Sequence, residues 1–285
     1  MRGEMEADKR QLLTGALIGA AVIPGLGLMS SAQAQEGDGG LDPNSVLAKV
    51  RKSGVLRMGY AQTAPWFYKD AKTGALQGIF YDVAEEMCKL MQVKGEYQEV
   101  TFADSTLALR RGDYDVFVSS LTYTVPRAVS AAYTSPPLWQ RGSLALIHKD
   151  NVGRFKTAPD LNSPNVTIAV NTGTSAEAQQ RRLFPKAKVL ATTGQILTAT
   201  EPVRTKRADD WLNGENDVVV FAKKNASWAA VLDEEHPFDK APNTWMMRYG
   251  DPAWEAFIGG FCNYMITQGF VKDRYDYHMN LMMNL

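Results

Sequence analysis

Nine consecutive residues, Ser119-Ser120-Leu121-Thr122-Tyr123-Thr124-Val125-Pro126-Arg127, place hydroxyl groups and one guanidinium directly after an apolar segment. Residues 114–119 predict a buried strand, so these polar groups lie where that strand ends. A strand end offers hydroxyls and free N–H groups, and the planar fork of Arg127 binds a carboxylate through two parallel hydrogen bonds. The stretch therefore favours capture of a small anion over catalysis.

Strands and helices alternate on both sides of this stretch. The predicted strands cover residues 55–60, 97–102, 114–119, 143–148, 166–170, 188–190 and 217–221. The predicted helices cover residues 45–52, 78–91, 105–111, 203–212, 253–268 and 272–283, and a further helix opens at residue 174. This alternation predicts an α/β fold with mainly parallel sheets that helices cover on both faces.

Two segments indicate that the chain crosses between two lobes. Residues 135–139 lead into the strand at 143–148, and residues 242–247 precede the last helices, which we expect to pack back on the first lobe. Small ligands usually bind in the cleft between such lobes. The predicted division is a flexible leader at 35–44, a first lobe from 45–139 and 242–285, and a second lobe from 140–241.

A weak internal repeat supports two related lobes. Residues 109–116 resemble residues 212–218, because both contain Gly-x-x-Asp-Val. In each copy we expect this motif between a helix end and a buried strand. The second copy therefore predicts its strand at Asp217–Phe221.

Residues 1–34 have the features of a cleaved signal peptide. Lys9 and Arg10 form a basic flank, residues 12–28 are apolar, and Ala32-Gln33-Ala34 is a small-x-small cleavage pattern. A membrane anchor is the alternative, but the apolar run is short for a span and Pro24 interrupts it. We expect export to the periplasm, by the general or the twin-arginine route.

Composition excludes several classes of protein. The 285 residues carry 31 basic and 31 acidic side chains, and a nucleic-acid binder would normally show a basic excess. The three histidines have no metal-ligand spacing, and neither a P-loop nor a GxSxG motif occurs. We therefore expect no metal, no cofactor and no catalytic residue. Cys88 and Cys262 are either a disulfide, which export permits, or two buried thiols.

Motifs in order along the chain resemble the extracytoplasmic solute-binding proteins of amino-acid ABC transporters, family 3. The similar segments are Gly54–Gly59, Ala64–Trp66, Gly78–Ala84, Leu107–Asp115, Ser119–Arg127 and Tyr133–Pro137. The resemblance covers nearly all of the expected mature chain. It implies the two-lobed type II periplasmic binding fold with two crossovers. It also implies a monomeric receptor that hands a small carboxylate, an amino acid or an analogue, to an ABC permease.

The resemblance also assigns roles to individual residues. Arg127 matches the arginine that clamps the ligand α-carboxylate, and Ser120 and Thr122 match hydroxyl positions that add hydrogen bonds. Gly173-Thr174-Ser175 opens a helix, where free N–H groups and the helix dipole favour an anion, and the equivalent family residues contact the carboxylate from the second lobe. Ordinary N-capping by Thr174 or Ser175 is the alternative reading of this segment. Arg127 and Ser175 would grip one anion from opposite sides and favour closure of the cleft.

Several aromatic residues are candidates for the walls of the cleft. Trp66 and Phe102 match ligand-facing or cleft-lining positions of the family, and Tyr60 and Tyr123 are further candidates. Aromatic residues at strand ends are also common in cores, so wall and core remain alternatives for each of them.

One departure from the family concerns the amino group of the ligand. The family has an aspartate after its Gly-x-x-Asp-Val strand that pairs with the ligand ammonium, and here Ala222 takes that place. A buried ammonium is costly to leave unpaired. Either the ligand lacks an α-amino group, as a keto, hydroxy or aromatic carboxylate does, or Glu177 or Glu201 supplies the charge.

Two other functions compete with the receptor. Some proteins of this fold dehydrate cyclohexadienyl substrates with a carboxylic acid as proton donor, and Ala222 removes the most obvious place for that acid. The other is a binding domain for a periplasmic partner or a sensor, which fits the missing aspartate. We expect no enzymatic activity.

Overall fold

The computed structural model describes residues 40–284. The predicted signal peptide and the first part of the leader, residues 35–39, lie outside these residues. Residues 41–284 belong to one compact unit. No helix in the described range is both long and apolar enough to cross a membrane.

Helices and strands alternate along the described residues. The helices are α1 (Val46–Ser53), α2 (Ile79–Met91), α3 (Phe102–Arg111), α4 (Val125–Ala128), α5 (Ser175–Leu183), α6 (Glu201–Arg204), α7 (Glu215–Lys224), α8 (Pro252–Thr267) and α9 (Phe270–Met283). The strands are β1 (Val55–Tyr60), β2 (Tyr68–Lys69), β3 (Leu76–Gln77), β4 (Lys94–Glu99), β5 (Val116–Thr122), β6 (Ala132–Tyr133), β7 (Trp139–His148), β8 (Thr167–Asn171), β9 (Lys188–Thr192), β10 (Asp210–Gly214), β11 (Ala229–Leu232) and β12 (Phe238–Met247).

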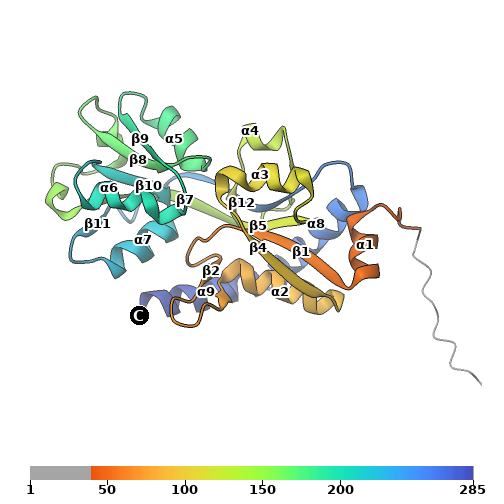
Figure 1. The fold of residues 1–285 in the computed structure, drawn as a ribbon. Coiled ribbons are helices and arrows are strands. Elements are labelled where there is room, and N and C mark those ends of the chain that lie inside the picture. Colours follow the sequence, from red (N-terminus) through yellow and green to blue (C-terminus); the bar gives the residue numbers. More distant parts are fainter. Residues whose placement is uncertain (1–39, 285) are drawn as a thin grey trace, which may run out of the picture. The chain divides into compact units, whose positions relative to one another are not determined.

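Two parallel groups of strands are joined through two long antiparallel strands. The strand order is β4-β1-β5-β12-β7-β10-β8-β9, with β6 beside β12 and β11 beside β7. Strands β4, β1 and β5 are mutually parallel, and so are β10, β8 and β9, whereas β7 and β12 run antiparallel to their neighbours. Figure 1 shows β7 passing from one group to the other. The predicted α/β fold with two crossovers is confirmed.

Each parallel group is the centre of one lobe with cores on both sheet faces. In the first lobe, Met58 and Val118 belong to one apolar cluster, and Phe117 belongs to another. In the second lobe, the neighbouring residues Trp211 and Leu212 fall into different clusters. Successive residues of a strand point to opposite faces, so helices and loops cover both sides of each sheet.

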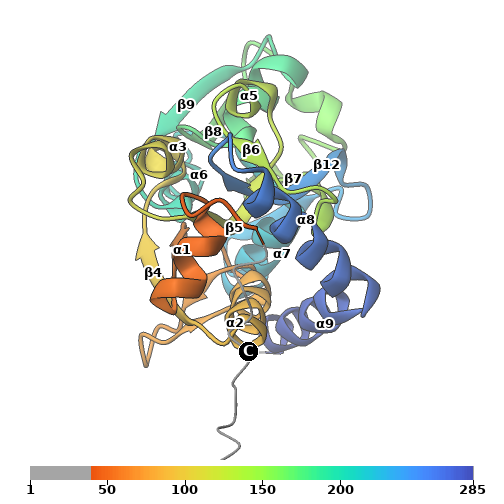
Figure 2. The same cartoon turned by 90° about the vertical axis from the view of Figure 1, so that its right-hand side faces the viewer.

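The C-terminal helices return to the first lobe. Helix α9 packs on α2 and also contacts α7 of the second lobe, and α8 contacts α1. Figure 2 shows α2 and α9 side by side. The lobe boundaries expected at 139/140 and 241/242 fall at the start of β7 and inside β12, and they stay predictions.

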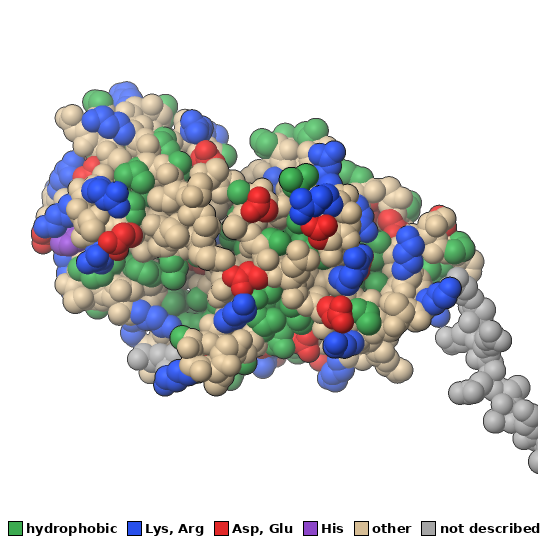
Figure 3. Space-filling view, in the orientation of Figure 1, with side chains coloured by type: hydrophobic (Ala, Val, Ile, Leu, Met, Phe, Trp, Pro, Cys, Tyr) green, Lys and Arg blue, Asp and Glu red, His purple; other side chains and the backbone are tan. Residues whose placement is uncertain are grey.

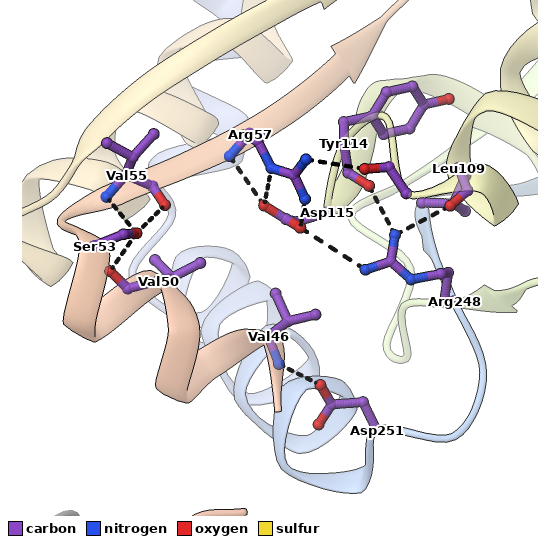
Figure 4. A network of polar contacts seen from close by, with 11 residues as sticks. Val46, Val50, Ser53, Val55, Arg57, Leu109, Tyr114, Asp115, Arg248 and Asp251 are labelled. Carbon is purple, nitrogen blue, oxygen red and sulfur yellow. Dashed lines mark hydrogen bonds and ion pairs between the residues drawn. The ribbon is translucent and has the colours of Figure 1, made fainter. Parts of the chain in front are cut away.

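A network of charged groups ties the start of the first lobe to its return segment (Figure 4). Asp115 accepts from Arg57 through Nη2 at 2.6 Å and Nε at 3.2 Å, and Arg248 lies 3.8 Å away. Arg248 also donates to the carbonyls of Leu109 and Tyr114. The buried Asp115 therefore has partners on β1 and after β12.

Local capping explains why the first helix begins and ends where predicted. Ser45 Oγ accepts from the N–H of Leu47, and Gly54 ends the helix at φ +70°, which glycine adopts without strain. Asp251, the N-cap of α8, also accepts from Val46 N and from Ser45 Oγ. One carboxylate therefore joins the N-termini of α1 and α8.

The prediction for the segment between 203 and 222 is wrong. The residues expected as a helix at 203–212 end in strand β10, and those expected as a strand at 217–221 form helix α7. Acidic residues in the first turn of α7 and lysines in its last turn complement the helix dipole. Val218 and Ala222, four residues apart, are buried on one face. These features outweigh the strand propensity of the valines.

Two inferences that depended on that segment are corrected with it. The repeat is not structural, because residues 109–116 run from helix to strand and residues 212–218 run from strand to helix. Ala222 is buried in the second-lobe core, and the residues that follow strand β10 are Glu215, Asn216 and Asp217. The site therefore does not lack an acid after its strand.

The two cysteines are buried and unpaired. Cys88 on α2 and Cys262 on α8 both belong to the first-lobe core. Burial raises the pKa of each thiol to about 12, so both stay protonated and behave as small apolar side chains.

Candidate ligand-binding site

A small cavity lies where the two lobes meet. Its first-lobe lining is Thr63, Phe102, Ser120, Leu121, Thr122 and Arg127, and its second-lobe lining is Arg141, Thr174, Ser175, Ile196 and Asn213. Its volume of about 20 Å³ holds about one water molecule. A wider groove of about 360 Å³ lies next to it and shares Phe102, Arg127 and Thr174 with the cavity.

The lobes contact each other directly around this cavity. Arg127 donates to the carbonyl of Gly173 across the cleft, and Gln195 Nε2 donates to Glu99 Oε1 at 2.8 Å. Gly173 has φ +78°, and a Cβ built there would lie 2.6 Å from Ala103 Cα of the first lobe. The structure is therefore a closed arrangement in which only glycine fits at residue 173.

Strand β5 and the turn after it supply the first-lobe polar groups. All seven residues of β5 are buried, and Ser120 and Thr122 lie on the same face because they are two residues apart. Ser120 Oγ accepts from Asn243 Nδ2 at 2.8 Å. Arg127 follows on the short helix α4 and donates to the carbonyl of Thr122 at 3.3 Å.

The N-terminus of α5 supplies the second-lobe groups. Thr174 stands at the N-cap, but its hydroxyl donates to the Asn171 carbonyl at 2.7 Å and caps no helical N–H. Glu177 accepts from the N–H of Gly173 at 3.0 Å. The ordinary capping interaction is therefore not formed by Thr174.

Arg141 on β7 is a second guanidinium in the cavity wall, and the sequence analysis missed it. Its side chain is 7% exposed, and Nη1 donates to Ser120 Oγ at 3.0 Å and to Asp217 Oδ2 at 2.9 Å. A Cβ at Gly214 would overlap the guanidinium, and the Trp66 ring lies 5.8 Å from Arg141 Cζ. The sequence carried no local signal for it, because Arg141 precedes the predicted strand at 143–148.

Asp217, in the first turn of α7, balances Arg141. The carboxyl group is buried, and burial raises its pKa to about 6 although Arg141 opposes the shift. One oxygen accepts from Arg141, and Oδ1 has no hydrogen-bond partner in the described structure. The Arg141–Asp217 pair therefore leaves one carboxylate oxygen without a hydrogen bond.

Two cavity-lining polar groups also have no partner among the described residues. They are Thr63 Oγ1 and Asn213 Nδ2, and the two residues are 2% and 5% exposed. Buried polar groups are nearly always hydrogen-bonded, so these two groups can bond to a ligand or to a water molecule in the cavity.

The structure brings together most of the predicted site residues and separates three of them. Arg127, Ser120, Thr122, Thr174, Ser175 and Phe102 line the cavity, and Gly173 lines the adjoining groove. Trp66 and Tyr60 lie in the first-lobe core, where Trp66 backs Arg141 and Tyr60 Oη donates to Glu99. Tyr123 is largely exposed on the surface.

Neither acid proposed as a substitute partner for an ammonium lines the cavity. Glu177 lines the outer groove, and Glu201 pairs with Arg204 on the surface. Within residues 40–284 no group of three or more His, Cys, Asp or Glu side chains could hold a metal ion. On the face drawn in Figure 3, acidic and basic side chains are interspersed.

Comparisons with known sequences agree on one family. The sequence model of the bacterial extracellular solute-binding proteins, family 3, matches residues 56–280. Cyclohexadienyl dehydratase from Pseudomonas aeruginosa is 21% identical over 252 residues, which cover 88% of this chain and 90% of that protein. An L-cystine-binding protein from Escherichia coli K12 is 28% identical over 163 residues, which cover 57% of each.

Solved structures show the same architecture. An ancestral amino acid-binding protein, described as a precursor of cyclohexadienyl dehydratase, is 29% identical with a TM-score of 0.74, covering 82% of this chain and all of that one. A binding component of an ABC transporter from Wolinella succinogenes, complexed with lysine, is 26% identical with a TM-score of 0.72, covering 79% and 95%.

Proposed function

The chain belongs to family 3 of the bacterial extracellular solute-binding proteins, and on that basis we propose that it is a periplasmic receptor. It captures a small carboxylate, an amino acid or an amino-acid-like acid, between its lobes and delivers it to an ABC permease. The observation that carries the proposal is the Arg127 guanidinium, which lines the cavity and reaches across to Gly173.

The present partners of Arg127 mark where a carboxylate would bind. Both are backbone carbonyls, of Thr122 in the first lobe and of Gly173 in the second. An ionised carboxylate is a stronger acceptor than a carbonyl, so a ligand would replace one or both of these bonds. The N-terminus of α5 begins two residues after Gly173 and adds its positive dipole end from the second lobe.

A ligand held by groups of both lobes stabilises the closed arrangement. Its affinity for the closed form exceeds its affinity for an open form, because the α5 contacts exist only on closure. The cavity of about 20 Å³ is too small for an amino acid, so a ligand enters only when the lobes separate, and the lobes then close around it less tightly than in this arrangement. Opening and closing about β7 and β12 is therefore part of the proposed cycle.

The second lobe has acids close to the site. The segment after β10 carries Glu215 and Asp217, and neither lines the cavity in the closed arrangement, so an ammonium partner requires one of them to move. Structures 26–29% identical to this chain include an amino acid-binding protein and a lysine complex. Amino acids therefore remain in the proposed ligand class.

A dehydratase is the second candidate, and Asp217 is the observation that favours it. A buried carboxyl group with a pKa of about 6 can donate a proton near neutral pH. The receptor is preferred because Asp217 does not line the cavity and is tied to Arg141, which stabilises its charged form. An assay in which the protein causes a cyclohexadienyl acid to lose carbon dioxide and water would favour the enzyme.

Thermal denaturation with a panel of amino acids, keto acids and aromatic carboxylates tests the receptor. A ligand at a hundred times its Kd stabilises the protein by about 2.7 kcal/mol. Arg127→Ala should abolish every ligand-induced rise in melting temperature. Arg204→Ala, which removes an exposed surface arginine, should leave these rises unchanged. If a ligand still raises the melting temperature of Arg127→Ala, its anionic group binds elsewhere.

A further inference from the structure

The cavity contains one guanidinium more than the capture of a single carboxylate requires. Arg141 lines the same cavity as Arg127 and is 7% exposed. The surroundings of Arg141 accommodate its guanidinium, because Gly214 leaves room for this group and the Trp66 ring lies on one side of it. A buried charged side chain at the wall of a ligand cavity is a candidate binding group.

We propose that Arg141 binds a second acidic group of the ligand, so that the site takes a small dicarboxylate. This inference rests on the proposed receptor function, in which Arg127 holds the first carboxylate. It specifies the ligand class more narrowly than that function does.

The two guanidiniums contact β5 at different residues. Arg141 donates to Ser120 Oγ, and Arg127 donates to the carbonyl of Thr122, two residues further along the strand. Because a guanidinium binds a carboxylate through two parallel hydrogen bonds, a single carboxylate cannot pair fully with both arginines, whereas two carboxylates on one short chain can each pair with one.

Two further groups of the cavity can donate to a ligand. Thr63 Oγ1 and Asn213 Nδ2 are buried without a partner among the described residues, and each can donate to a ligand oxygen. These groups can serve the carboxylate oxygens that the two arginines do not reach.

The charge balance suits an acidic amino acid. Arg127 and Arg141 bring two positive charges to the cavity, and Asp217 brings one negative charge, so the excess is one positive charge. An amino acid with two carboxylates and one ammonium carries one net negative charge and brings this sum to zero.

Isothermal titration calorimetry with two matched pairs of ligands tests this. The pairs are L-glutamate with L-glutamine, and glutarate with its monoamide glutaramate, so each pair differs by one charge at nearly constant shape. The full mature protein should bind the diacid of one pair at least tenfold more tightly than its amide. Equal affinity for acid and amide would overturn the proposal and assign Arg141 a structural role, with the receptor function intact.

Two variants identify the residue responsible. Asp217→Asn frees Arg141 from its protein partner and should tighten diacid binding further. Arg141→Gln combined with Asp217→Asn removes both charges together, so the fold is not left with a lone buried charge, and it should abolish the preference for the diacid while amide binding remains. A preference that survives the double substitution would overturn the assignment of Arg141.

Failure of the wider receptor function gives a different result. If none of the four ligands binds the wild-type protein, and no carboxylate of the thermal panel does so either, both proposals fail. If amides and monocarboxylates bind and depend on Arg127, the receptor stands and only the second acidic subsite falls.

Discussion

Two buried aspartates, Asp115 in the first lobe and Asp217 at the cleft, both pair with arginine, but they differ in how completely they are satisfied. Asp115 accepts from the backbone and guanidinium of Arg57 and has Arg248 beside it (Figure 4). Asp217 accepts from Arg141 alone and keeps one oxygen without a partner. The first network is a structural tie, whereas the second reaches the cavity wall through Arg141 and leaves one carboxylate oxygen without a hydrogen bond.

The cleft pair gives the largest expected effect. Arg141→Met leaves Asp217 buried without its ion-pair partner, which costs about 3–5 kcal/mol of unfolding free energy at pH 8. Burial already raises the pKa of Asp217 to about 6, against about 3.9 for an unfolded aspartate, and loss of Arg141 raises it further. The folded state then holds the proton more tightly, so the variant regains stability as the pH falls from 8 to 5.

Urea denaturation at the two pH values measures this change. The double variant Arg141→Met with Asp217→Leu removes both charges and should recover most of the stability at pH 8. A stability of Arg141→Met that does not depend on pH would show that Asp217 is not the group left unpaired.

The structural tie should behave differently. Asp115→Asn weakens its bonds to Arg57 and Arg248 and should lower the unfolding free energy by about 1–3 kcal/mol, with solvent screening of the half-exposed Arg57 favouring the lower value. Ligand affinity should stay unchanged, because Asp115 does not line the cavity. The exposed neighbour Asp113→Asn is the control and should change neither quantity. Loss of ligand affinity in Asp115→Asn would break the distinction between the two aspartates.

A third aspartate, with no partner for either oxygen, extends the comparison. Asp210 on β10 is fully buried, and burial, with a smaller contribution from Asp209, raises its pKa well above the ordinary value. The folded state therefore binds this proton more tightly, and stability is lost as the pH rises above about 4. Asp210→Asn should be more stable than wild type at pH 8, by about 1–2 kcal/mol, and equal to it at pH 4. Calorimetric melting at both pH values tests this, and equal stability at pH 8 would contradict it.

Local signals explain how much of the fold could be predicted. Helix α1 was predicted because Ser45 and Gly54 carry cap signals within the sequence itself. Helix α7 was missed because its valines have strand propensity, and the packing of Val218 on Trp211 that favours the helix depends on tertiary structure. Propensity is decisive only where packing does not compete with it.

Part of the candidate site could likewise be predicted from local sequence, and part could not. Ser120, Thr122 and Arg127 lie within one short segment, so their grouping was visible in the sequence. Arg141 reaches Ser120 and Asp217 across 21 and 76 residues, and no local pattern connects these positions. Groups brought together only by the crossing of β7 between the lobes could not be found from spacing.

The position of Trp66 behind Arg141 has an optical consequence. Its indole ring is fully buried, 5.8 Å from the guanidinium carbon, and it packs near the rings of Trp139 and Tyr275. Indole emission responds to the electric field of nearby charges, and neutralising Arg141 would change that field at short range. Among the six tryptophans of the chain, Trp66 is therefore placed so that its emission would change if the charge at Arg141 were neutralised.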